Sequence, residues 1–106
     1  MILNHITHSV HVHVNRMGDM IKNHLGELSR RVDCIQDIRG LGLHIGVELT
    51  KPGAPLVSRA LERGLIINCT AERVIRIMPP LTITASAVKA GMRILERVFL
   101  EEGDAR

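Results

Sequence analysis

The sequence of 106 residues has the length of a single domain, and its composition allows a buried core. With 45% hydrophobic and 24% charged residues it lies outside the class of disordered chains, and with 1% aromatic residues its core has to be built from aliphatic side chains and methionine. The formal charge of +3 comes from basic residues interleaved with acidic ones, so we expect no nucleic-acid partner.

The cysteines and the N-terminal segment indicate a cytoplasmic protein. Cys34 and Cys69 are far apart, form no CxxC motif and lie in apolar stretches, so we expect reduced thiols. The N-terminus has no apolar segment behind a basic one, and no apolar run reaches the ~20 residues that span a bilayer. We therefore expect neither export nor contact with a membrane.

The first half of the chain predicts a helix, two strands and a second helix. Apolar side chains recur at steps of three and four over residues 15–31, which is typical of an amphipathic helix. Residues 34–39 and 43–49 alternate between apolar and polar and are separated by glycines, which favours two strands joined by a tight or bulged bend. A second helix is predicted to begin at Pro55 and to end before Gly64.

The second half predicts two more strands and a last helix. Residues 65–69 and 74–78 are rich in β-branched side chains and close enough to pair antiparallel. The last helix begins near Thr84 or Ser86, either of which can cap it, and ends near Glu101. This order predicts an α/β (α+β) two-layer sandwich in which helices cover one face of a small, largely antiparallel sheet.

Three segments of the sequence resemble a known family. Residues 38–49 (IRGLGLHIGVEL) resemble the glycine-punctuated hairpin in the small domain of class III, pyridoxal-phosphate-dependent aminotransferases. Residues 60–69 (ALERGLIINC) and 74–84 (VIRIMPPLTIT) resemble the acetylornithine and succinylornithine branch. The similarity runs in order from about Val14 to Phe99. It implies that residues 14–106 form the C-terminal small domain of a fold-type I aminotransferase.

The resemblance also implies an activity and a cofactor. The family transfers an amino group between N-acetylornithine, or a similar ω-amino acid, and 2-oxoglutarate by means of pyridoxal phosphate, as a part of arginine metabolism. Its Schiff-base lysine lies in a large domain upstream of the matched segments. Lys22, Lys51 and Lys89 stand in ordinary helix-surface and turn contexts, so we expect this chain alone to hold no cofactor and no catalytic residue.

Arg76 is the residue for which we predict a role in substrate binding. It is the one charged residue in the strand 74–78, where a charge is costly unless it is paired. Composition alone favours an edge strand from which Arg76 reaches water, whereas the resemblance implies the arginine that pairs with the substrate α-carboxylate. Arg39 could bind a carboxylate or line a domain interface, and a solvent-facing role fits it equally well. His44 fits a structural strand histidine better than an acid or base.

Residues 1–13 do not resemble the family, and we expect them to be disordered. They contain His5, His8, His11 and His13, of which the last two would share one face of an extended chain and could hold Zn²⁺ or Cu²⁺. Because no Cys, Asp or Glu completes such a site, we expect no bound metal.

The chain as a whole leaves several partners and functions open. As a small domain it would pair with the large domain of an aminotransferase or associate with itself, and the intact enzyme would bind an amino acid substrate. Two alternatives are an independent protein-interaction module and a truncated remnant without function.

Overall fold

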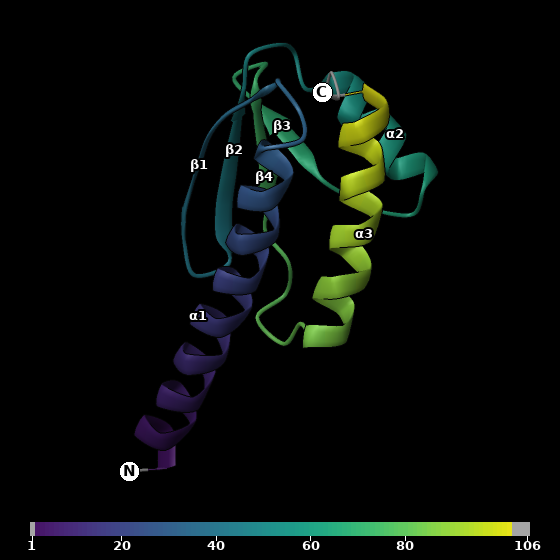
Figure 1. Cartoon of the computed structure of the whole chain (residues 1–106). Helices are drawn as coiled ribbons and strands as arrows, with labels where there is room; N and C mark the ends of the chain where they lie inside the picture. The colour runs from purple at the N-terminus through teal and green to yellow at the C-terminus, as the bar shows by residue number, and fades with distance from the viewer. Residues whose placement is uncertain (1, 103–106) are drawn as a thin grey trace.

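The computed structural model describes the backbone of residues 2–102 and the side chains of residues 9–102. Four strands form one antiparallel sheet in the order β1-β2-β4-β3, and the helices cover one of its faces (Figure 1). This arrangement confirms the predicted two-layer α/β sandwich. The elements are α1 (Ile2–Ser29), β1 (Ile35–Leu41), β2 (His44–Leu49), α2 (Ala54–Glu62), β3 (Asn68–Thr70), β4 (Val74–Ile77) and α3 (Ala85–Glu102).

The alternation along β2 shows which face of the sheet the helices cover. Ile45, Val47 and Leu49 are buried, whereas the residues between them are half-buried and belong to the other face. The helices contribute the apolar stripes that the sequence predicts, and no polar or charged residue of the described part of the chain is buried. Burial of apolar side chains is therefore the main force that holds the two layers together. The helical core residues are Met17, Ile21, Leu25 and Leu28 of α1, Leu56 and Ala60 of α2, and Val88, Met92, Leu95, Val98 and Phe99 of α3.

A two-residue turn at Gly42 and Leu43 joins β1 to β2, at the bend that the sequence predicts. Gly42 has a φ of +59°, a left-handed conformation that glycine adopts without steric cost. The turn lies against α1, because a Cβ atom on Gly18 would overlap the carbonyl oxygen of Gly42. The two glycines therefore allow the hairpin and the first helix to approach each other closely.

The first helix begins earlier than we predicted. α1 starts at Ile2, so the described backbone from residue 2 onward is helical where we expected residues 1–13 to be disordered. The contacts of α1 with the core begin near its middle, where the ring Nε2 of His13 donates a hydrogen bond of 2.6 Å to the carbonyl oxygen of Ile83 and Val14 packs against the buried side chains. Although α1 has 28 residues, no described helix has an apolar stretch long enough to cross a bilayer.

The third strand is shorter than predicted, because residues 65–67 lie outside the sheet. The backbone N–H of Leu65 donates a hydrogen bond of 2.8 Å to the carbonyl oxygen of Ala60. This bond belongs to the end of α2, so residue 65 cannot use the same donor in the ladder of the sheet.

The end of α2 and the start of α3 agree with the sequence pattern. Gly64, with a φ of +86°, follows the end of α2. At the start of α3 the hydroxyl oxygen of Thr84 accepts a hydrogen bond of 3.1 Å from the backbone N–H of Ala87. Thr84, rather than Ser86, is therefore the residue that caps this helix.

Candidate functional site

The uncovered face of the sheet carries a row of four residues, one from each strand. Arg39 of β1 pairs with Gly46 of β2. Gly46 also pairs with Arg76 of β4, whose other neighbour is Asn68 of β3. Because residues in register point to the same face, two arginines flank a glycine there. A hollow of about 270 Å³ opens over this part of the sheet, and its lining also includes His44, Thr70, Val74 and Met78.

Arg76 lies in the interior of the sheet and not on an edge, because β4 runs between β2 and β3. The edge-strand alternative for this residue is therefore wrong. Its side chain is exposed on the uncovered face, while Ile75 and Ile77 point to the core. The guanidinium Nη2 donates to the sulfur of Met78 at 3.4 Å, which is a weak acceptor. Among the described residues no carboxylate pairs with Arg76, so its donors remain available to an anion.

Arg39, at the other side of the hollow, already has two carboxylate partners. Its Nη1 lies 3.1 Å from Oδ2 of Asp37, and its Nη2 lies 2.9 Å from Oε1 of Glu48. These partners compensate the charge of Arg39 and hold its side chain on the sheet. These ion pairs favour the solvent-facing role of Arg39 over the binding of a substrate carboxylate.

His44 lines the same hollow but has no partner that would orient its ring. It is exposed at the start of β2, opposite Leu41. Within residues 9–102 no hydrogen bond to its imidazole is found, whereas a general base usually has a second group that positions it. The contacts therefore give no support for an acid or base at this position.

The other histidines do not form a site in the described part of the chain. His11 is exposed and His13 is bonded to Ile83, while the side chains of His5 and His8 lie outside the described residues. Residues 9–102 contain no group of three His, Cys, Asp or Glu side chains that could hold a metal ion.

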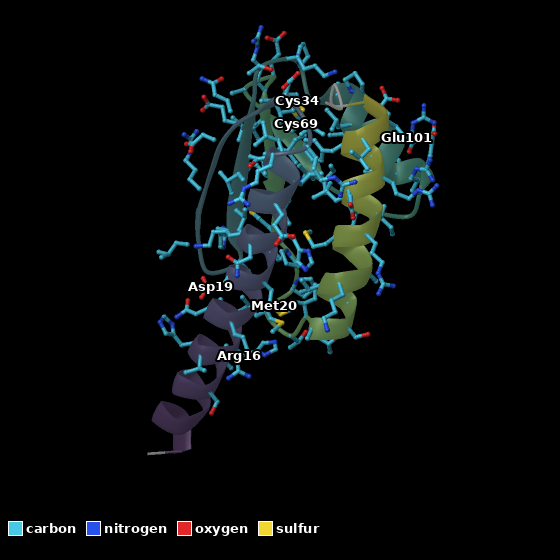
Figure 2. All side chains as sticks on the ribbon, in the orientation of Figure 1. Arg16, Asp19, Met20, Cys34, Cys69 and Glu101 are labelled. Atoms are coloured by element: carbon cyan, nitrogen blue, oxygen red, sulfur yellow. The ribbon has the colours of Figure 1, made fainter. Side chains whose placement is uncertain are left out.

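Both cysteines lie toward the end of the molecule opposite the N-terminus (Figure 2). Cys34 is buried, Cys69 is half-buried, and neither forms a disulfide. The thiol of Cys69 donates to the carbonyl oxygen of Glu72 at 3.2 Å.

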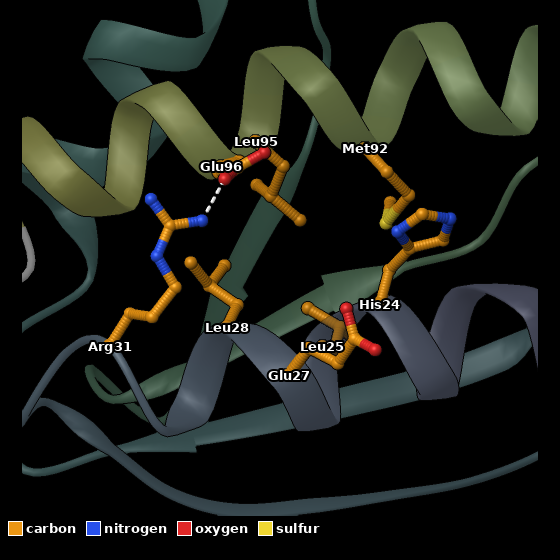
Figure 3. A pocket seen from close by; sticks show the side chains of 8 residues that line it. All are labelled: His24, Leu25, Glu27, Leu28, Arg31, Met92, Leu95 and Glu96. Carbon is orange, nitrogen blue, oxygen red and sulfur yellow. Dashed lines mark hydrogen bonds and ion pairs between the residues drawn. The ribbon is translucent and has the colours of Figure 1, made fainter.

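A second, smaller cleft lies between α1 and α3 (Figure 3). Its volume of about 50 Å³ leaves room for a few water molecules and is far below the roughly 300 Å³ at which ligand pockets begin. Arg31 and Glu96 form an ion pair across one end, and the ring of His24 lies beside Met92 at the other (Figure 3). This cleft is a helix-helix contact and not a substrate site.

Two members of the hollow, Gly46 and Thr70, did not stand out in the sequence. Gly46 is one glycine among several in its hairpin, and Thr70 lies at the end of a short strand. The pairing of β2 and β3 with β4 brings both residues to the face of Arg76, and a single sequence does not reveal this register.

Comparison with known proteins finds relatives that all belong to one family. A family model described as aminotransferase class-III matches residues 2–99, which begins well before Val14. The acetylornithine aminotransferase of Methanothermobacter thermautotrophicus is 41% identical over 84 residues, which are 79% of this chain and 22% of that protein. The protein of the same name from Methanocaldococcus jannaschii is 42% identical over 77 residues, which are 73% of this chain and 19% of that protein.

Solved structures agree with these relatives. The ornithine aminotransferase of Toxoplasma gondii has a TM-score of 0.83 at 26% identity and matches 90% of this chain and 24% of its own. The acetylornithine aminotransferase of Elizabethkingia anophelis has a TM-score of 0.83 at 24% identity and matches 90% of this chain and 25% of its own. The chain therefore spans about a quarter or less of the length of its relatives. The match over residues 2–99 shows that it belongs to the class-III aminotransferase family.

Proposed function

We propose that this chain supplies the small domain of an acetylornithine-type aminotransferase and that Arg76 is its contribution to substrate binding. The observation that carries this proposal is the unpaired guanidinium at the centre of the uncovered sheet face. Arg76 also belongs to residues 74–84, one of the segments that resemble the acetylornithine branch. The proposed reaction is amino transfer from N-acetylornithine, or a similar ω-amino acid, to 2-oxoglutarate.

The geometry of the hollow suits a carboxylate ligand. A guanidinium binds a carboxylate with two parallel hydrogen bonds, and charge-assisted bonds contribute roughly 1.5–3 kcal/mol each. Arg76 projects from a strand that is paired on both sides, so its backbone is held in place before a ligand arrives. Arg39 is already compensated by Asp37 and Glu48, which leaves one effective positive charge for one carboxylate.

The residues of this chain do not fit a site for pyridoxal phosphate, the cofactor that the family implies. When bound in a transaminase, that cofactor supplies the stabilisation of the substrate carbanion. Lys22 donates to the carbonyl oxygen of Gly40 at 3.3 Å, Lys89 is exposed on α3, and Lys51 lies in the turn before α2. None of the three lines the hollow. We therefore assign the cofactor site to a part of the enzyme outside these 106 residues.

This assignment has a direct test on the purified chain. After incubation with pyridoxal phosphate and reduction with borohydride, we expect no stoichiometric adduct in the mass spectrum, because no described lysine lies beside the hollow. Labelling of one specific lysine to completion would contradict the assignment. Free N-acetyl-lysine methylamide in the same mixture serves as the positive control for the chemistry.

An exposed apolar surface supports a partner for this domain. A cavity of about 370 Å³ between α3 and the chain around Pro79 is lined by apolar residues. Ile66 and Met78 form part of this lining and are 81% and 44% exposed, and Leu81 beside them is also exposed. We propose the large domain of the enzyme as the partner and the cytoplasm as the location. The same surface would serve a self-associating interaction module, which is the second candidate function.

The experiment combines this chain with the acetylornithine aminotransferase of M. thermautotrophicus from which the matching region has been removed. We expect neither part alone to transfer an amino group from N-acetylornithine to 2-oxoglutarate and the mixture with pyridoxal phosphate to do so. Arg76→Ala should abolish the activity without preventing assembly, whereas Arg93→Ala, an exposed arginine on α3, should leave it intact. Assembly without activity in the wild-type mixture would contradict the proposed function and favour the interaction module.

A further inference from the structure

Gly46 occupies a position where neither the backbone nor the packing requires a glycine. Its φ is outside the left-handed region. A Cβ atom at this residue would lie 3.6 Å from Cγ1 of Val74 and 3.9 Å from the carbonyl oxygen of Arg39, which are ordinary van der Waals distances. Gly40 on the neighbouring strand is different, because its Cβ would overlap the carbonyl oxygen of His44.

A glycine in the middle of a strand weakens that strand. The unfolded chain loses more conformational freedom there than at any other residue, and no side chain packs against the neighbours. β2 is paired on both sides, so Gly46 is fully inside the sheet. A glycine that the fold does not need in such a place often marks a close approach by another molecule. The neighbours of Gly46 indicate what that molecule is.

We propose that Gly46 is a specificity residue whose missing side chain leaves room for the carbon chain of an aliphatic carboxylate beside Arg76. Gly46 is in register with Arg76 and lines the hollow. A carbon chain resting on Gly46 would contact the apolar side chains of Val74 and Met78, which line the same hollow. Arg39, on the other side, is held by its two carboxylates, so the ligand carboxylate is directed to Arg76. This inference rests on the proposed role of Arg76 and adds the shape of the ligand to it.

The inference makes different predictions for two ligands of equal charge. Formate has a carboxylate without a carbon chain, whereas pentanoate carries four additional carbon atoms. Both are titrated into the ¹⁵N-labelled full chain, and binding is followed in every variant by the backbone N–H signals of the residues that line the hollow. In Gly46→Ala we expect the affinity for pentanoate to fall roughly tenfold, as for one misplaced methyl group in a fitted site, and the affinity for formate to change little.

Stability supplies a second, independent readout. Because the fold has room for a Cβ atom, Gly46→Ala should raise Tm by roughly 2–8 °C while it weakens pentanoate binding. A residue with only a structural role would not combine these two effects. Gly46→Val should weaken pentanoate binding further. If the valine variant does not fold, the alanine variant alone tests the role of Gly46. Gly26→Ala is the matched control, since a Cβ atom there meets nothing within 4 Å on α1.

The outcomes separate this inference from the role of Arg76. Loss of binding in Arg76→Ala together with unchanged pentanoate binding in Gly46→Ala would overturn the role of Gly46 and leave Arg76 in place. Equal losses for formate and pentanoate in Gly46→Ala would also overturn it, because a steric effect depends on the size of the ligand. Unchanged formate and pentanoate binding in Arg76→Ala, or no binding to the wild-type chain, would overturn the proposed role of Arg76 and with it the inference.

Discussion

At the scale of single residues, the turn between β3 and β4 holds two non-glycine residues in a left-handed backbone conformation. Ala71 has a φ of 50° and Glu72 a φ of 67°, a region that costs L-amino acids roughly 1–2 kcal/mol each. The turn is kept in this shape from outside, because the carbonyl oxygen of Glu72 accepts hydrogen bonds from the backbone N–H of Gly53 at 2.8 Å and from Cys69. The strain is therefore confined to this turn, and a substitution within the turn can remove it.

Glu72→Gly should therefore stabilise the chain. Glycine removes the steric cost at this φ, and after its larger entropy loss on folding a net gain of roughly 0.5–1 kcal/mol remains, which raises Tm by roughly 2–8 °C. Thermal unfolding followed by circular dichroism measures the effect. Glu72→Ala removes the charge but keeps the Cβ atom, so equal stability of the glycine and alanine variants would refute this explanation.

The sequence revealed Arg76 and only part of its surroundings. A single charge in an apolar strand is visible in the sequence, and so is the resemblance of its segment to a family. The ion pairs of Arg39 with Asp37 and Glu48 depend on the register that the turn at Gly42 and Leu43 sets between β1 and β2, which places Asp37 opposite Glu48. Because this register is decided by the pairing of two strands, a single sequence could not show which of the two arginines is already compensated.

At the scale of the elements, ion pairs join α2 to the last turns of α3. Nη2 of Arg63 donates to Oε2 of Glu101 at 2.7 Å, and Nε and Nη2 of Arg59 donate to Oε1 of Glu102 at 3.1 and 2.9 Å. The hydrogen bond from Arg63 and the nearby positive charges lower the pKa of Glu101. The hydrogen bonds that Arg59 donates to Glu102, together with the charge of Glu62, raise the pKa of Arg59. These pairs are partly exposed, so their contribution to stability is small.

The lowered pKa of Glu101 gives a pH dependence with a definite sign. The folded chain holds this carboxylate ionised more firmly than the unfolded chain, so the stabilisation is complete above the ordinary pKa of 4.5 and is lost as the pH falls through the lower folded value. We expect Glu101→Gln to lower Tm slightly at pH 7 and to have no effect at the acid end of the range. Glu27→Gln, at an exposed position of α1, is the control. A difference between wild type and Glu101→Gln that grew on acidification would contradict this sign.

Two element boundaries show where a sequence pattern is sufficient and where it is not. Ile6 and Val10 continue the three- and four-residue spacing of Val14 and Met17 toward the N-terminus, so the spacing alone also fits the longer α1, although residues 1–13 do not resemble the family. The start of β3 had no such signal. Ile66 and Ile67 have β-branched side chains, but the backbone N–H of Leu65 donates to Ala60 and completes the C-terminal turn of α2, a local contact that overrides β-propensity.

At the scale of the whole molecule, the chain is elongated and leaves apolar surface uncovered. Its principal extents are 50 × 23 × 23 Å, and the N-terminal part of α1 projects beyond the sheet and α3 (Figure 1). Leu41 and Ile66 are 85% and 81% exposed. A domain that normally packs against a larger one is expected to expose such surface when it is isolated.

We therefore expect the isolated chain to associate with itself at tens of micromolar, a concentration at which interfaces of roughly 6 kcal/mol become populated. Analytical ultracentrifugation measures the association, and a dye that fluoresces on apolar surfaces measures the exposure. Ile66→Ser should reduce both signals, whereas Ser58→Ala, at an exposed position of α2, should change neither. A monomer that binds no dye would remove the physical support for a missing partner domain.

The fold as a whole followed from the sequence because each element had its own local signal. Strand alternation, helical spacing and the glycine bend predict the same two-layer order that the structure has. The sequence does not show what covers the second face of the sheet, because the polar residues of that face are equally compatible with contact to water and to a partner. Only the combination of the register, the unpaired Arg76 and the match to class-III aminotransferases makes that face a candidate substrate site.

The central claim is that Arg76 binds the substrate α-carboxylate, and one ratio tests it most directly. In the reconstituted enzyme, kcat/KM is measured for N-acetylornithine and for N-acetylputrescine, which lacks the carboxylate. Arg76→Lys keeps the charge but loses the paired hydrogen bonds, so kcat/KM for N-acetylornithine should fall on the order of tenfold to a hundredfold, and further in Arg76→Ala. The value for N-acetylputrescine should change much less, and Tm should hold. Equal losses for both substrates, or a large fall in Tm, would make Arg76 a structural residue and contradict the claim.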